Sequence, residues 1–511
     1  MNDSDNSLSS SRCDAVKKCL LSRLFLSVLL TLSCSVVLLS LAVNVGIIAA
    51  ILQPFHSPEL NLKIETSFFT IEHGSTGGTP ASESYFFRIP DKILGVEFIF
   101  TELIKKGNAH DDVSHTAPSE SGIPLYWQLS DDGTLLLLYR KQLAVRASNA
   151  RDATLLEDGV SDFLIAQTAV YSRSGSETVV LGQDLLNTHF GVPFEMTDFT
   201  EPSSFEIRVV NIKGYPRNIN FVLEVRSLVS QVQATVWTFV SFALLPDTPM
   251  VSRVADHRIG YFATQYTNIG VHPTTTRTPY DETKLPASIG AYEVDRQINV
   301  INKWRLEKSD DCDDLTNKMG CKPLKPILYY VDPTVPSVWQ KYVKIGIELW
   351  QPAFAALGFK DTPRAILPED DDFPADYDSG DIRYASVSFA ISRDSVFSVG
   401  PSVTDPRTGE ILDADIGFSQ EWVHAFSGEI SKESLSGLSL YDAMSSKHDH
   451  RRLRSRHGCD HERLASFMDD IGMSMRMLAD VSDNNGRVPT EIIGRGLAGV
   501  TVHEVGHTLG L

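Results

Sequence analysis

The chain has 511 residues, of which 42% are hydrophobic, 22% charged and 9% aromatic. This composition is typical of globular domains and excludes a disordered chain, and the length predicts about three domains. The net charge of −19 argues against a nucleic-acid-binding protein, because affinity for nucleic acid depends on basic side chains that neutralise phosphates.

Residues 24–52 carry no charge and are dominated by Leu, Val, Ile, Ala and Phe. The run exceeds the roughly 20 residues needed to cross a bilayer, and Lys17, Lys18 and Arg23 precede it. It predicts a transmembrane signal anchor after a cytoplasmic tail, residues 1–23. The expected protein is a single-pass type II membrane protein that contacts the membrane through residues 24–52 and has an extracellular or lumenal body. Cleavage as a signal peptide is the alternative, and the body would then be secreted.

Residues 53–250 predict a β-rich domain. Short runs of β-branched and aromatic residues alternate there with Gly, Ser, Asp and Pro clusters, at Tyr85–Ile89, Val96–Phe100, Thr134–Tyr139, Phe205–Val210 and Asn220–Val225. The polar, Pro-punctuated residues 251–325 predict an irregular connecting segment. Within it, Cys312 and Cys321 bracket a short polar loop, and a disulfide between them is plausible in an oxidising compartment.

Residues 326–511 change to alternating strand and helix signals. A buried strand is expected at Ile327–Val331, followed by a helix that opens at Pro336-Ser337. The apolar face of this helix is expected to comprise Val338, Tyr342, Ile345, Leu349 and Phe354. Two further strands are expected at Arg364–Leu367 and Ile382–Ile391, and an amphipathic helix is expected over residues 464–478. Gly400–Thr404 and Glu410–Phe418 predict a hairpin, because the Asp-Pro-Arg-Thr-Gly between them is a strong turn sequence. The predicted fold class is α+β.

The last residues of the chain carry the clearest chemical pattern, His-Glu-x-x-His. His503 and His507 are four residues apart, so on a helix both imidazoles leave the same face and can bind one Zn²⁺. Glu504 is placed to act as general base on a zinc-bound water without being a ligand. Gly510 occupies the position where the longer His-Glu-x-x-His-x-x-Gly-x-x-His pattern requires a glycine to turn the chain. The rival interpretation is a surface helix that carries two hydrogen-bonded histidines.

Gly494, Gly496 and Gly499 also spell a Gly-x-Gly-x-x-Gly pattern. A dinucleotide site needs a preceding strand and an acidic residue about 20 positions further on. The given sequence ends before that position, and the zinc pattern occupies the same helix, so a dinucleotide site is disfavoured. Gly496, Gly499 and Gly510 are expected on the histidine face, in close packing around the metal.

Two clusters are weaker candidates for metal sites. The first comprises His448, His450, His457, Cys459 and His461, which surround an arginine-rich stretch that favours an exposed basic loop. The second, Glu369–Asp372, could bind Ca²⁺, although a solvated acidic loop is the simpler interpretation.

Several segments together resemble the bacterial-type zinc-dependent metalloproteases of the met-zincin kind. They are HEVGHTLGL, the preceding GPSVTDPRTGEILDADIGF, AFAALGFKD and PILYYVDP, and the upstream LLPDTPMVSRVADHRIGYFATQYT. The resemblance implies a metzincin-like mixed sheet over a zinc helix, with His503 and His507 as ligands and Glu504 as catalytic base. It also implies that the edge of the hairpin strand binds a peptide or protein substrate in extended form.

The expected activity is therefore zinc-dependent metalloendopeptidase activity. The sequence ends at Leu511, before the third ligand and the Met-turn that the family pattern places downstream, so this chain alone is expected to be incomplete and inactive. The alternative is a membrane-anchored, non-catalytic relative whose β-rich ectodomain binds a partner.

Overall fold

The computed structural model describes part of the chain. Except for Glu59 and Ser75, the described residues belong to one compact unit, Leu60–Gly74 and Glu83–Leu511. The described residues are 59–66, 68–75, 83–107, 118–147, 150–182, 186, 205–227, 235–256, 260–268, 297–308, 312, 320–391, 397–427 and 488–511.

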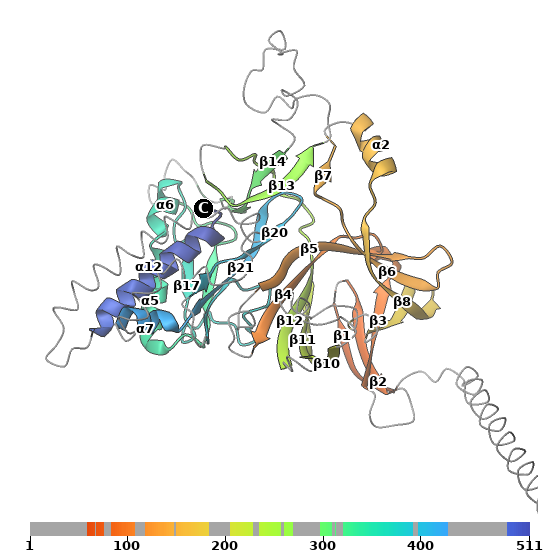
Figure 1. The fold of residues 1–511 in the computed structure, drawn as a ribbon, viewed down its shortest axis with the longest axis horizontal. Helices are drawn as coiled ribbons and strands as arrows, with labels where there is room; N and C mark the ends of the chain where they lie inside the picture. The colour runs from red at the N-terminus through yellow and green to blue at the C-terminus, as the bar shows by residue number, and fades with distance from the viewer. Residues whose placement is uncertain are drawn as a thin grey trace, which may run out of the picture. The chain divides into compact units, whose positions relative to one another are not determined.

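The first and largest sheet has 11 strands, and its recorded pairings from β3 to β10 are antiparallel (Figure 1). Its spatial order is β1 (Glu59–Glu65), β2 (Thr70–Ser75), β3 (Glu83–Pro90), β9 (Glu177–Leu181), β8 (Phe163–Ser174), β6 (Leu135–Arg140), β5 (Pro118–Leu129), β4 (Phe98–Lys106), β12 (Thr235–Leu244), β11 (Asn218–Ser227) and β10 (Phe205–Gly214). The short helices η1 (Asp91–Ile93) and α2 (Ala150–Gly159) accompany it.

The central strands of this sheet are apolar on both faces for a structural reason. In β4, Phe98, Phe100 and Ile104 point into an aromatic core that also contains Phe221 and Phe242. Ile99, on the opposite face, instead packs with Val403 of a different sheet. A strand covered on both sides cannot show the alternation of a half-exposed strand, which explains its nearly continuous apolar sequence.

A second sheet of seven strands carries the C-terminal region. The parallel strands β15 (Lys303–Trp304), β21 (Glu410–Ser419), β18 (Ser386–Ala390), β16 (Leu328–Val331) and β17 (Arg364–Ile366) lie side by side in that order. Strands β19 (Ser398–Val399) and β20 (Ser402–Asp405) pair antiparallel with β21. The accompanying helices are α5 (Ser337–Glu348), α6 (Gln351–Ala356), α7 (Glu421–Ser427) and α12 (Thr490–Thr508).

A third sheet of three strands contains β14 (Gln297–Ile301), β13 (Ala263–Asn268) and β7 (Val145–Arg146). Strands β13 to β15 fall within residues 251–325, which sequence patterns predicted to be irregular. The prediction underestimated strand content here because these strands are only two to six residues long, and β13 is largely polar.

The predicted hairpin between residues 400 and 418 is confirmed by the pairing of β20 with β21. Asp405 accepts hydrogen bonds from the backbone and guanidinium of Arg407, and Gly409 closes the turn with φ of +76°. The predicted helix after Pro336 is also confirmed. It ends at Glu348, and α6 begins at Gln351 with Pro352 in its first turn.

The predicted apolar face of α5 is only partly confirmed, since Tyr342 is buried as expected. Val338, Ile345 and Leu349 are exposed, whereas the buried face is built around Val343, Gly346 and other residues one position away. The helix turns this face inward because the glycine allows α12 to approach it closely, which a search for large apolar residues does not detect.

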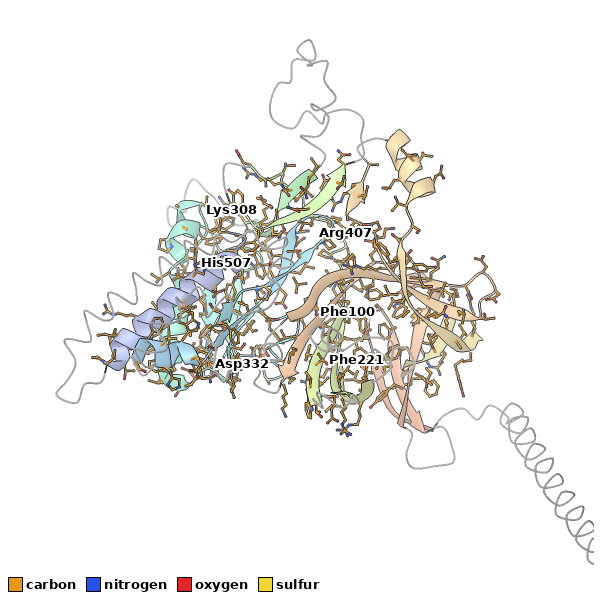
Figure 2. The ribbon with its side chains drawn as sticks, viewed as in Figure 1. Phe100, Phe221, Lys308, Asp332, Arg407 and His507 are labelled. Carbon is orange, nitrogen blue, oxygen red and sulfur yellow. A yellow bond between two sulfur atoms is a disulfide. The ribbon has the colours of Figure 1, made fainter. Side chains whose placement is uncertain are left out.

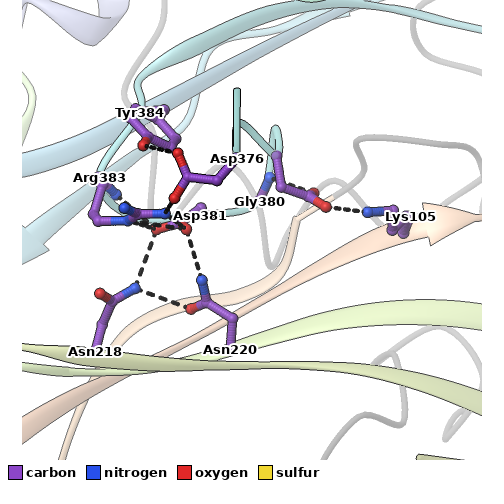
Figure 3. Close-up of polar contacts among 9 residues, drawn as sticks. Lys105, Asn218, Asn220, Asp376, Gly380, Asp381, Arg383 and Tyr384 are labelled. Atoms are coloured by element: carbon purple, nitrogen blue, oxygen red, sulfur yellow. Dashed lines mark hydrogen bonds and ion pairs between the residues drawn. The ribbon is translucent and has the colours of Figure 1, made fainter. Parts of the chain in front are cut away.

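The two larger sheets meet through a buried polar network, which Figure 3 shows in close-up. Asp381 is 1% exposed and accepts hydrogen bonds from Asn218 Nδ2 and Asn220 Nδ2 of β11, at 3.1 and 2.7 Å. The guanidinium of Arg383 also binds Asp381, with its shortest contact at 2.7 Å, and stacks on the ring of Tyr215. Every partner of this buried carboxylate is fixed, so the network holds the loop after β17 against β11.

The predicted α+β class is wrong, because strands dominate the described residues and 11 of them form one antiparallel sheet. Sequence patterns located many of the strands but shortened them. The runs Phe205–Val210 and Asn220–Val225, for example, are parts of the ten-residue strands β10 and β11. Polar residues at half-exposed positions continue these strands beyond their apolar centres.

The predicted single-pass type II localisation is also contradicted. Among the residues with described structure, no helix combines the length and the apolar composition needed to cross a bilayer. The prediction rested on the composition of residues 24–52, and both this segment and the predicted tail, residues 1–23, lie outside the described residues.

Replacement of Asp381 by Ala tests the network between the sheets. The change leaves Arg383, Asn218 and Asn220 without their shared acceptor, and breaking such a buried pair should lower the free energy of unfolding by about 3–5 kcal/mol. The matched control is Asp372→Ala, which removes an exposed ion pair with Arg364 and should cost less than ~1 kcal/mol. Urea denaturation of both variants checks this, and equal effects would contradict a special role of Asp381.

Candidate metal centre

Helix α12 carries all three residues of the His-Glu-x-x-His pattern. The rings of His503 and His507 lie side by side, with centroids 4.4 Å apart and planes at 81°. Figure 2 labels His507 near the C-terminal end of this helix. The four-residue spacing therefore brings the two imidazoles together, as the helical period requires.

Glycines allow α12 to pack closely on its neighbours. A Cβ on Gly346 of α5 would lie 2.5 Å from Thr501 Cβ, and a Cβ on Gly494 would overlap the ring of Tyr342. Gly496 faces the ring of Phe426 on α7. The prediction that Gly496 packs around the metal is therefore wrong, because its contact is an aromatic ring of a neighbouring helix.

The C-terminal end of α12 is fixed by contacts from residues distant in sequence. Gly510 adopts φ of +95°, and a side chain there would overlap the carbonyl oxygen of Asn302. The glycine confirms the expected turn, although its packing partner is backbone. The indole of Trp304 donates to the carbonyl of Thr508 at 2.8 Å, and Trp350 donates to the carbonyl of Val502 at 2.9 Å. These bonds fix the turns that carry the histidines.

His503 has a ring nitrogen that could bind a metal. Its Nε2 is buried and has no hydrogen-bond partner. Burial, and then repulsion from His507, lowers the pKa of His503 to about 4. The imidazole is thus neutral near pH 7, which is the form that binds metals.

The tautomer of His507 follows from one contact. Its Nδ1 lies 3.0 Å from the carbonyl oxygen of Leu511, and a carbonyl can only accept a hydrogen bond. Burial lowers the pKa of His507, so the ring is neutral with its proton on Nδ1. Nε2 is then the unprotonated nitrogen, the arrangement that accompanies histidine ligands in metal sites.

Glu504 is buried beside the two histidines, with only 3% of its surface exposed. The hydroxyl of Ser398, on β19, donates to Glu504 Oε1 at 2.6 Å. Burial raises the pKa of Glu504 to about 7, and the bond from Ser398 partly opposes this shift. A carboxyl group with this pKa can exchange a proton near neutral pH.

The two imidazoles fit a soft or borderline divalent metal such as zinc, since both are neutral and His503 offers a buried nitrogen without a partner. Across the described ranges, no three His, Cys, Asp or Glu side chains converge on a common point. The histidines could therefore supply two ligands, and no third ligand is assigned among the described residues.

The two strands along the edge that was predicted to bind substrate, β20 and β19, contact different parts of the protein. At β20, Val403 packs with Ile99 of the first sheet, and Gly122 of β5 lies against the backbone of Thr404. Strand β19, at the other end of this edge, lies beside α12 and carries Ser398. Contact with Glu504 is thus made by β19.

Two other features singled out from the sequence fall among the described residues, the cysteine pair and the acidic loop. Cys312 and Cys321 form a disulfide with Cα atoms 5.9 Å apart. In the acidic loop Glu369–Asp372, Asp372 pairs with Arg364 and Asp370 accepts from the backbone of Leu367, which suits the solvated-loop interpretation. The structure does not describe the expected helix over residues 464–478 or the other candidate metal cluster, which comprises His448, His450, His457, Cys459 and His461.

Sequence patterns did not identify Ser398, Trp304, Trp350 or Tyr329 as neighbours of the histidine helix. The hydroxyl of Tyr329 is buried 2.7 Å from Thr508 Oγ1, which lies 179 residues away in sequence. Ser398 is separated from Glu504 by 106 residues. No local spacing signals such pairs, because they exist only once the sheet and α12 have packed together.

The pH dependence of folding stability, measured in the presence of a chelator, tests whether His503 and Glu504 are buried as described. The unfolded chain protonates His503 near pH 6.5, whereas the folded chain does so only near pH 4. The parent protein should therefore lose stability relative to His503→Gln as the pH falls from 6.5 to 4.

Glu504, whose pKa is raised in the folded chain, should give a pH dependence of stability in the opposite direction. Relative to Glu504→Gln, the parent should lose stability as the pH rises from 4.5 to 7. Parallel melting-temperature curves for all three proteins would contradict these assignments.

Comparison with known proteins gives one partial match. Residues 163–278 match a family described as a domain of unknown function, DUF5117. The match starts at β8 and includes β9 to β13, so it crosses from the first sheet into the third. No curated protein and no solved structure matches the chain.

Proposed function

We propose that this protein is a zinc-dependent metalloendopeptidase that acts on peptide or protein substrates. The observation that carries the proposal is the buried, partnerless Nε2 of His503 beside the ring of His507. A buried nitrogen without a partner costs about 1–3 kcal/mol, and a role as metal ligand accounts for it. The sequence resemblance to zinc-dependent metalloproteases of the met-zincin kind supports the same two residues.

His503 and His507 would hold the zinc ion, each through Nε2. Bound zinc supplies Lewis acidity, which polarises a substrate carbonyl and makes a water molecule more acidic. The hydrogen bond from His507 Nδ1 to Leu511 orients that ring and fixes its tautomer before metal arrives. The bonds from Trp304 and Trp350 to α12 keep both imidazoles on one face.

Glu504 would act as the general base. It is held on the same helix as the ligands, and its pKa of about 7 lets it take a proton from the attacking water at neutral pH. The same carboxyl group then donates that proton to the departing amine as the peptide bond breaks. Its burial excludes bulk water, which strengthens its interaction with charge that develops at the scissile bond.

A non-catalytic binding protein is the second candidate, and exposed apolar side chains favour it. Phe163, Leu164 and Ile165 follow one another at the start of β8, and each exposes more than a third of its surface, as Leu155 of α2 does. Exposed apolar groups of this kind are typical of protein contact surfaces. This candidate requires neither zinc nor Glu504.

Glu504→Gln distinguishes the two functions. In a protein extended past Leu511 through a third ligand, the variant should keep stoichiometric zinc, because both imidazoles remain, and should lose at least ~100-fold in peptide cleavage, because the base is gone. His503→Gln should lose zinc and activity together. Metal analysis and turnover of an unfolded protein substrate measure both properties.

The matched control is Glu491→Gln. It makes the same chemical change at the start of α12, where Glu491 binds Tyr342 and Arg495 away from the histidines, and it should retain both zinc and cleavage. Full cleavage by Glu504→Gln, or cleavage without zinc, would overturn the roles proposed for Glu504 and the metal. A parent protein that binds no zinc and cleaves nothing would favour the binding protein.

A further inference from the structure

Strand β19 reaches over the helix that carries the candidate catalytic residues. It pairs antiparallel with β21, with Ser398 opposite Phe418 and Val399 opposite Gly417. The carbonyl of the preceding residue, Phe397, accepts hydrogen bonds from the backbone of Ser419 and from the indole of Trp422, at 2.9 and 3.0 Å. Two donors on one carbonyl fix the position of the residue immediately before Ser398.

The strand lies unusually close to Glu504. A Cβ added to Gly400 would lie 2.8 Å from the main-chain oxygen of Glu504 and 3.2 Å from its Oε2. The methyl carbon of Thr508 would be 3.3 Å away. No side chain fits at residue 400 without displacement of the helix, so the glycine is what permits this approach.

Because β19 lies this close to α12, the Ser398 side chain contacts the Glu504 carboxylate directly. Its hydroxyl donates to Oε1 at 2.6 Å, while Oε2 is the carboxylate oxygen that lies close to Gly400. A glutamate side chain can rotate about three bonds, and a base is effective only when its oxygen faces the proton that it removes. One short bond from a fixed strand removes most of that freedom.

We propose that Ser398 is a positioning residue that holds the Glu504 carboxylate in the orientation needed to act as a base, with Gly400 as the residue that allows the contact. The inference rests on the proposed peptidase function and adds a specific role for β19. The Ser398 hydroxyl bonds to Glu504, which is not a proposed zinc ligand, so its loss should affect the base without removing the metal.

The first test compares three variants of the protein extended past Leu511 through a third ligand. Ser398→Ala should lower kcat roughly 10- to 100-fold, with KM and zinc content unchanged, because only the orientation of the base is lost. Ser398→Thr keeps the hydroxyl and should recover most of the rate. Ser388→Ala is the matched control, since Ser388 is a buried serine of neighbouring β18 that bonds a carbonyl of β21 and makes no bond to Glu504.

The second test does not depend on activity. A double-mutant cycle with Ser398→Ala and Glu504→Ala, followed by urea denaturation without zinc, should give a midpoint shift for the double variant smaller than the sum of the single shifts. Additive shifts mean that the two side chains do not interact, and they overturn the inference whatever the cleavage assay shows.

The outcomes separate the two proposals. If the parent cleaves peptides with zinc and Ser398→Ala keeps its full kcat, the positioning role is wrong while the peptidase function stands. If the parent binds no zinc and cleaves nothing, the peptidase function fails and the positioning role fails with it, even where the cycle shows coupling. Loss of kcat with coupled shifts and rescue by threonine supports the inference.

Discussion

The candidate centre depends on the close packing of helix α12 against α5. Glycine stands on both sides of this contact, Gly346 on α5 and Gly494 on α12, and a methyl group at either site would overlap the opposite helix. Residues with larger side chains would separate the helices, and α12 would move away from the sheet whose strand β19 contacts Glu504. Chain flexibility at these glycines costs helix stability, at roughly 1 kcal/mol each relative to alanine, so close approach is the reason for their presence.

The first sheet and the C-terminal sheet are joined by charge as well as by apolar contact. Asp381 is buried where β11 meets the second sheet, and it is tolerated there because two amides and one guanidinium surround it. Such a network is geometrically demanding, since each donor must arrive at a defined angle. It therefore fixes one relative arrangement of these two sheets more strictly than apolar packing alone, which tolerates sliding.

Local sequence patterns predicted the features that are local in space. The spacing of His503, Glu504 and His507 placed them on one helix, and the turn sequence from Asp405 to Gly409 placed the hairpin. The long strands of the first sheet were only partly predicted, because their polar positions resemble loop sequence. Ser398 was missed altogether, because its partner lies 106 residues away and the contact depends on the register of β19 with β21.

The indoles that hold α12 also give the molecule an internal optical probe. Trp304 and Trp350 each donate to a carbonyl of the two helical turns that carry the histidines. Indole emission responds to the loss of a hydrogen bond and to the arrival of water. Movement of the histidine helix thus changes the fluorescence of two tryptophans that are already in place, without any label attached to the chain.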